Sequence, residues 1–128
     1  MKAKGVIISV PEAVAGSPVD SHQFLVALAL AYHRAVAVRL REEPEAVVRT
    51  ARDNLARWLA SGAFDSGTAA SLREWVSILD GSTTEELLAL ITAETDEGQR
   101  LRQSSPFAGG LTEEERLEIM DACEWAAA

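Results

Sequence analysis

Apolar residues recur at helical rather than strand spacing along most of this chain. Between Pro44 and Gly62 they fall within a stripe about 120° wide on a helical wheel, which is typical of an amphipathic helix packed on a core. A proline in the first turn and a glycine just past the last turn support the same limits. Similar patterns predict a first helix from about 18 or 21 to 43, and later helices over about 68–80, 82–91, 96–103 and 113–126.

Several of these helices begin at residues that can cap them. Ser82 and Glu85 have the spacing of a capping box, and so do Thr112 and Glu115. Asp96 can cap the short fifth helix. Six helices with short turns predict an all-α fold, a compact bundle of five to six helices.

The N-terminal segment differs from the rest. Residues 6–10 are rich in β-branched side chains between Gly5 and Pro11, and they are compatible with one short strand, whereas 11–20 predict a loop. We therefore divide the chain into an extension over 1–20, a short strand or flexible arm, and a single helical domain over 21–128. The first apolar run is shorter than a signal peptide needs, and the apolar stretch 24–32 is shorter than a bilayer span. A cytoplasmic protein that does not enter a membrane is expected.

The first half of the first predicted helix is apolar on nearly all sides. Such a helix must be covered on several sides, so we expect it to be both the central helix and part of a subunit interface. We therefore predict a homodimer whose interface contains Phe24, Leu25, Leu28 and Tyr32.

The charge is unevenly distributed between the two halves of the chain. The 128 residues carry a net charge of −8, with 12 Lys and Arg against 20 Asp and Glu. Residues 63–128 hold four arginines and fourteen acids, so the acidic charge lies in the C-terminal half. An acidic surface repels phosphate and attracts basic partners, although solvated helix faces give the same composition.

No pattern for catalysis or for metal binding is found in the sequence. His22 and His33 are eleven residues apart, about 16 Å along a helix, so one metal ion cannot bind both. We expect both to be partly buried polar residues. Cys123, the only cysteine, has no histidine within thirty residues, and we interpret it as a small buried hydrophobic residue. The prediction is a protein without enzymatic activity, cofactor or metal.

Residues 66–91 can be read as two helices around a turn, the arrangement of a helix-turn-helix. The second helix would place Glu85 and Glu86 where a recognition helix needs basic or amide side chains. The basic second predicted helix is the one candidate for phosphate contact, through Arg49, Arg52 and Arg57. We expect no tight DNA binding by the isolated chain, and DNA binding in complex with a partner stays open.

The predicted loop after the fifth helix carries one large aromatic residue, Phe107, near Arg100 and Arg102. Aromatic and arginine side chains on loops are typical interface anchors, so we predict that these three residues form part of a partner surface. In the alternative, Phe107 packs against Leu101 and Leu111 inside the monomer.

Four runs in the chain resemble a group of small, uncharacterised, helical bacterial proteins associated with toxin–antitoxin gene pairs. The runs are Arg-Leu-Arg-Gln-Ser-Ser-Pro-Phe-Ala-Gly at 100–109, His-Arg-Ala-Val-Ala-Val-Arg-Leu-Arg at 33–41, Ala-Arg-Asp-Asn-Leu-Ala-Arg-Trp at 51–58 and Leu-Arg-Glu-Trp at 72–75. The resemblance covers about residues 30–120, and typical members start close to the first helix. In such pairs the small protein looks like the antitoxin half. The resemblance implies a protein partner and brings no catalytic residues.

These observations together predict a non-enzymatic protein–protein interaction module, an antitoxin-like protein that binds and neutralises a partner. The acidic charge fits a basic toxin as that partner. The alternative is a small DNA-binding transcriptional regulator.

Overall fold

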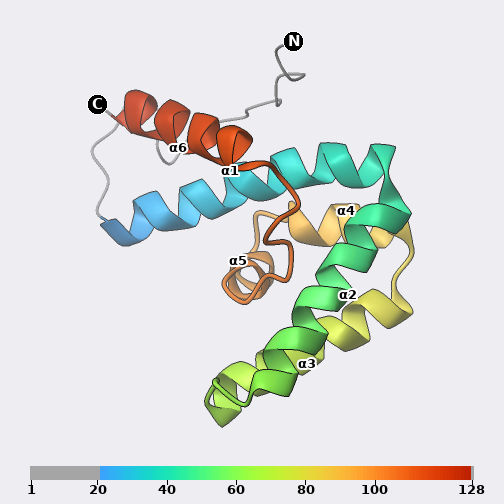
Figure 1. The fold of residues 1–128 in the computed structure, drawn as a ribbon. Coiled ribbons are helices and arrows are strands. Elements are labelled where there is room, and N and C mark those ends of the chain that lie inside the picture. The colour runs from blue at the N-terminus through green and yellow to red at the C-terminus, as the bar shows by residue number, and fades with distance from the viewer. Residues whose placement is uncertain (1–20, 128) are drawn as a thin grey trace.

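The computed structural model describes residues 21–127, which form six α-helices with no strand among them (Figure 1). The all-α prediction is confirmed over these residues. The predicted strand at 6–10 and loop at 11–20 lie outside the described residues. The helices are α1 (Ser21–Glu42), α2 (Pro44–Ser61), α3 (Ser66–Gly81), α4 (Thr84–Ile91), α5 (Asp96–Arg102) and α6 (Glu113–Ala127).

Helix α1 is the central element, as predicted, because it contacts α2, α4, α5 and α6. Figure 1 shows α6 running along the first half of α1, while α2 and α3 pack against each other on the other side of the molecule. Small residues are common among the buried positions of α1, which lets neighbouring helices approach closely. The buried residues of α1 are Ala27, Leu30, Ala31, His33, Ala35, Val36, Ala37 and Leu40.

By length and composition alone, α1 is also the one helix within 21–127 that could cross a membrane. However, 44% of its most apolar window is buried inside the fold. The core helix of a water-soluble protein has the same composition and length, so this signal is weak.

The helix ends confirm some predicted caps and correct others. Pro44 begins α2 and Gly62 ends it with a φ of 67°, a left-handed conformation that glycine adopts without strain. The predicted capping box of Thr112 and Glu115 is present. The backbone N–H of Thr112 donates to the Glu115 carboxylate at 2.8 Å, and the backbone N–H of Glu115 donates to the Thr112 hydroxyl at 3.1 Å.

Two predicted caps are wrong by one residue. The box at the start of α4 is formed by Thr83 and Glu86, because Ser82 already serves as the residue after the last turn of α3. The N-cap of α5 is Thr95, whose hydroxyl accepts from Gly98 N at 3.0 Å. Asp96 lies instead in the first turn, where its negative charge still favours the helix dipole.

The turn between α4 and α5 is close-packed around Gly98. A Cβ atom at this position would lie 2.3 Å from the carbonyl oxygen of Ala93. Only glycine fits there without a shift of the backbone, so this residue fixes how closely the start of α5 approaches the end of α4.

The largest buried side chains meet where α1 and α3 enclose the chain segment between α5 and α6. Phe107, from that segment, is 1% exposed. Its ring packs edge-on against Trp75 of α3, with centroids 5.6 Å apart, and edge-on to His33 of α1 at 6.1 Å. Edge-to-face contacts of this kind stabilise an aromatic cluster beyond the area that it buries.

Candidate functional site

The segment between α5 and α6, which we call the central loop (residues 103–112), is held in the core by side chains from α1 and α2. The hydroxyl of Tyr32 donates to the carbonyl of Phe107 at 2.8 Å. The amide of Asn54 donates to two carbonyls, those of Pro106 at 2.9 Å and Ala108 at 2.7 Å. The carbonyls of residues 106–108 are thus satisfied by side chains, while turn bonds such as that from Gly110 N to Phe107 O, at 3.0 Å, pair other backbone groups of the loop.

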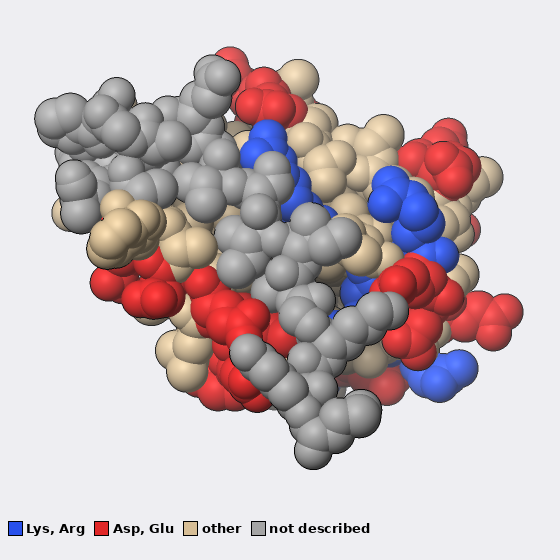
Figure 2. Space-filling model, turned by 90° about the horizontal axis from the view of Figure 1, so that it is seen from above, with Lys and Arg blue, Asp and Glu red and all other residues tan. Residues whose placement is uncertain are grey.

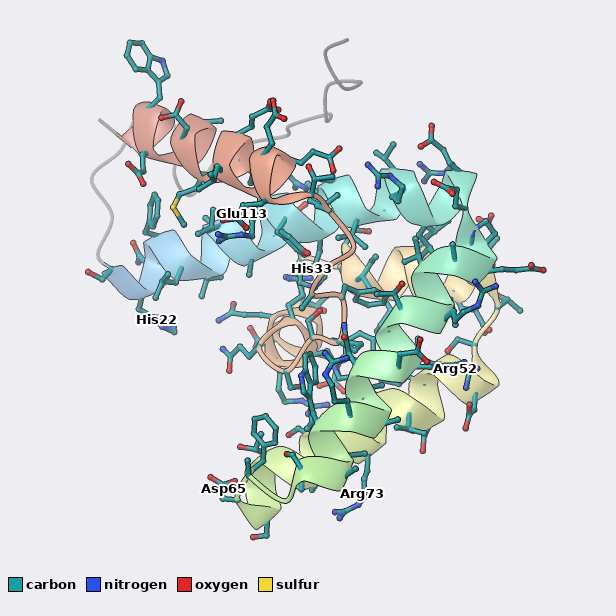
Figure 3. The ribbon with its side chains drawn as sticks, in the orientation of Figure 1. His22, His33, Arg52, Asp65, Arg73 and Glu113 are labelled. Atoms are coloured by element: carbon teal, nitrogen blue, oxygen red, sulfur yellow. The ribbon has the colours of Figure 1, made fainter. Side chains whose placement is uncertain are left out.

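Among the polar contacts of Ser105, the one with His33, which Figure 3 labels, joins residues farthest apart in the sequence. Its Nδ1 atom lies 2.7 Å from the carbonyl oxygen of Ala29, which can only accept, so Nδ1 carries the proton. Its Nε2 atom therefore accepts from the Ser105 hydroxyl at 2.6 Å, and that oxygen accepts from Phe107 N at 3.2 Å. Burial lowers the pKa of His33 to about 4, helped by the nearby charge of Arg102 and opposed by the Ala29 carbonyl.

A serine bonded to a histidine is also the pairing found in nucleophilic catalysis. There the histidine must take up the serine proton, and a carboxylate on its other nitrogen stabilises the resulting cation. His33 instead has a carbonyl at that position, and burial disfavours its charged form. The arrangement is therefore suited to holding Ser105 in place and poorly suited to activating it.

The structure corrects the expectation that Phe107 and Arg102 lie on an exposed surface. Phe107 packs inside the monomer, as the alternative proposed. Arg102 is buried, and its guanidinium donates to the carbonyls of Ile91 at 3.2 Å and Ala93 at 2.7 Å. Ile91 is the last residue of α4 and Ala93 follows just past its C-cap, so Arg102 satisfies carbonyls that the end of the helix leaves unpaired. Burial lowers the pKa of Arg102.

Arg100 is the exposed member of the three predicted partner residues. Its guanidinium forms two bonds to Glu74, at 2.9 Å and 2.8 Å, and two to Glu97, at 2.7 Å and 3.0 Å. Hydrogen bonds to Arg100 lower the pKa of both carboxyl groups. This exposed pairing links α3 to α5, and a role of Arg100 in partner binding stays a prediction.

The four residues predicted at a dimer interface differ in exposure. Leu25 is 60% exposed. Phe24, Leu28 and Tyr32 are half-buried and pack against the core of their own chain. Leu25 is therefore the side chain of this set that is most available to a second copy.

The two histidines also differ. His22 is exposed near the start of α1, whereas His33 points toward the central loop (Figure 3). Cys123 is fully buried, as predicted, and burial raises the pKa of its thiol. Within the described part of the chain, no group of three or more His, Cys, Asp or Glu side chains is placed to hold a metal ion.

Grooves open on the surface of the described residues, and two of them border elements described above. One, of about 440 Å³, lies beside the central loop and has Trp58, Phe64 and Leu72 on its apolar wall, with Arg100 and Ser105 among its polar groups. The other, of about 710 Å³, lies where α2 and α4 begin and α3 ends. There the side chain of Arg52 pairs with Asp80, and its Nη2 atom donates to Leu79 O at 3.1 Å.

Helix α6 has two contrasting sides. Its inner side holds Glu115, Ile119 and Cys123, all buried. Burial raises the pKa of Glu115, but bonds from Thr112 N and from Arg39, at 2.8 Å, outweigh it and the net shift is downward. This pair attaches the start of α6 to α1.

The opposite side of α6 exposes two large apolar residues. Leu117 is 49% exposed and Trp125 is 84% exposed, the largest exposed fraction among the described large apolar residues. Glu118, Asp121 and Glu124 lie close to them along the helix, and Figure 2 shows the charge on this part of the molecule. That view looks down on the face that carries α6, and a group of acidic side chains at its lower left contains no Lys or Arg.

Comparison of the chain with protein-family models, with curated proteins and with solved structures finds no match.

Sequence reasoning missed two features that the geometry brings out. Asn54 interrupts the apolar stripe of α2, and a polar residue in a core stripe could have indicated a buried hydrogen bond. Trp125 stands near the end of a helix without a clear apolar face, and that too is visible in the sequence as an unaccounted aromatic residue.

Proposed function

We propose that this chain is a non-enzymatic protein–protein interaction module, an antitoxin-like protein that binds and neutralises a partner protein. The proposal rests on how its polar and aromatic groups are used. His33, Ser105, Asn54 and Arg102 are engaged in holding the central loop and the end of α4. Among the described large apolar side chains, the most exposed is Trp125, on an acidic helix.

The exposed tryptophan is the single observation that carries the proposal. Tryptophan is enriched among the residues that dominate the binding energy of protein interfaces, because it buries a large apolar area at small loss of side-chain entropy. An 84% exposed Trp125 contributes little to the stability of its own fold. A partner that covers it would gain that burial.

The same chain is proposed to form a homodimer through α1. The first thirteen residues of α1, 21–33, contain no Asp, Glu, Lys or Arg, so two copies can approach there without charge repulsion. Leu25, 60% exposed, would lie at the centre of such a contact.

DNA binding by the isolated chain has weaker support. Helix α4 follows α3 after a short turn, as the second helix of a helix-turn-helix would, but it is eight residues long and carries Glu85 and Glu86, both exposed, in its first turn. Their charges oppose a phosphate backbone. A role in DNA binding would therefore need the basic surface of a partner.

The neighbouring gene provides the test of the proposed function. Its product should slow growth when expressed alone, and co-expression of this chain should restore growth and yield a complex that co-purifies. A neighbouring product that is harmless alone, or one whose toxicity this chain does not relieve, contradicts the proposal.

A further inference from the structure

We infer that the outward side of α6, which we call the α6 face (Leu117, Glu118, Asp121, Glu124 and Trp125), is the docking surface, and that it fits a basic protein surface with an apolar recess. This inference rests on the proposed function and names the chemistry of the partner. It follows from three features of α6: its attachment, its charge and the position of that charge.

The attachment of α6 leaves the α6 face free. Glu115, Ile119 and Cys123 follow one another at four-residue spacing and are buried against the rest of the fold. Leu117 and Trp125 each stand two residues from a member of that row, which places them on the opposite side of the helix. They are about 12 Å apart along the axis, so one partner surface can contact both.

The charge of α6 is strongly negative and largely unpaired. The helix contains six acids and one arginine, Arg116, which pairs with Glu113 at 2.6 Å. Glu118, Asp121 and Glu124 have no ion pair with any cation in the described part of the chain. Their charge is therefore available to an approaching partner.

The position of Glu124 is unfavourable for the helix itself. Carboxylates stabilise the first turn of a helix, where Glu113 and Glu114 lie, and destabilise the last turn, where the helix dipole is negative. Glu124 lies in the last turn of α6, which has no basic residue. Helix stability thus does not account for Glu124 beside Trp125, whereas attraction of a basic surface does.

The charge of the α6 face also favours a basic partner over a second copy of this chain. A symmetric contact through the α6 face would bring its carboxylates against those of the partner copy, which is repulsive. Self-association would instead use the uncharged first half of α1. Lysine or arginine around an apolar recess would pair with Glu118, Asp121 and Glu124 and cover the indole of Trp125.

The decisive test compares two sets of variants that remove the same amount of charge. Glu118→Gln/Asp121→Asn/Glu124→Gln neutralises the α6 face. Its matched control, Glu43→Gln/Asp53→Asn/Glu85→Gln, removes three exposed carboxylates from other helices or turns. Trp125→Ala tests the aromatic residue, which is too exposed for its loss to unfold the protein. Circular dichroism and melting verify that every variant keeps its fold.

Binding is measured by calorimetry with the full chain and a synthetic amphipathic helix composed only of lysine and leucine as the probe. We expect the first triple variant and Trp125→Ala each to weaken binding at least about tenfold, and the control triple variant to weaken it by less than about twofold. Raising the salt to about 150 mM should weaken binding by the unmodified protein, because screening reduces the attraction. Equal losses in the two triple variants would overturn the inference, because they would indicate attraction by net charge alone.

The same variants separate this inference from the proposed function. If the unmodified chain and all variants relieve the neighbouring product's toxicity equally, the proposed function stands and the docking surface is overturned. Binding of the probe with the expected pattern, but no effect on the neighbouring product, supports the surface and contradicts the function. Binding to zwitterionic lipid vesicles that depends on Trp125, in place of probe binding, would assign the α6 face to a membrane and overturn a protein partner.

Discussion

His33 and Ser105 are 72 residues apart in the chain, yet the Nε2 atom of His33 accepts a hydrogen bond from the Ser105 hydroxyl at 2.6 Å. This part-buried contact joins the central helix to the central loop. Together with the bonds from Tyr32 and Asn54, it explains how a loop of polar sequence places Pro106 and Phe107 in the core.

The buried, neutral state of His33 predicts that stability falls as the pH is lowered from about 6.5 to about 4. The folded pKa is about 4, below the ordinary value of 6.5, so the unfolded chain binds more protons in this window and folding is favoured as pH rises. The total loss of folding stability is on the order of 3 kcal/mol, and it is complete once the pH is below the folded pKa of His33. Urea unfolding at several pH values measures it. The slope should shrink in His33→Gln and persist in His22→Gln, whose side chain is exposed; an unchanged slope in His33→Gln would refute the assignment.

Truncation of Phe107 should destabilise the protein far more than truncation of Arg100. Phe107→Ala removes a buried ring and should lower the free energy of unfolding by about 3–5 kcal/mol. Arg100→Ala removes exposed ion pairs and should lower it by less than about 1 kcal/mol. Thermal melting of the two variants decides, and a small loss for Phe107→Ala would mean that the ring is not part of the core.

Asn54→Ala should be more damaging than its position on a helix suggests. The substitution leaves the carbonyls of Pro106 and Ala108 without their donors, and unsatisfied buried groups cost about 1–3 kcal/mol. Asp53→Ala, at the exposed neighbouring position, serves as the control and should change stability by less than about 0.5 kcal/mol. Similar melting temperatures for the two variants would contradict the anchoring role of Asn54.

The proposed dimer contact can be tested at Leu25. Light scattering should show a dimer for the unmodified chain at micromolar concentration, and Leu25→Glu should convert it to a monomer with unchanged helix content. A glutamate there would place a like charge against its symmetry mate. Phe64→Glu, at another exposed apolar residue, should leave the dimer intact. A monomeric unmodified chain would end the dimer proposal.

The helices could be predicted from the sequence because local signals define them, as Pro44 and Gly62 do for α2. The start of α4 was predicted one residue too early, at Ser82 with Glu85. Ser82 and Thr83 each have a glutamate three residues later, and the end of α3 decides between them. Local pattern gave two equal answers, and tertiary structure selected one.

The central loop was harder to predict because its contacts are non-local. The Tyr32–Phe107 bond spans 75 residues, and no periodicity in the sequence indicates it. Arg102 has the composition of a surface cation, and α5, at seven residues, is too short to reveal a buried side by periodicity. Burial of Phe107 and Arg102 followed from these distant contacts, so the expected partner surface was partly wrong.

The measurement that tests the central claim most directly is the affinity of the purified chain for the neighbouring gene's product, by isothermal titration calorimetry. A protein that neutralises this partner by binding should show a dissociation constant on the order of 1 µM or tighter, together with loss of the partner's toxic activity in the same mixture. Absence of binding heat at concentrations of about 10 µM, with the partner's activity unaffected, would contradict the claim.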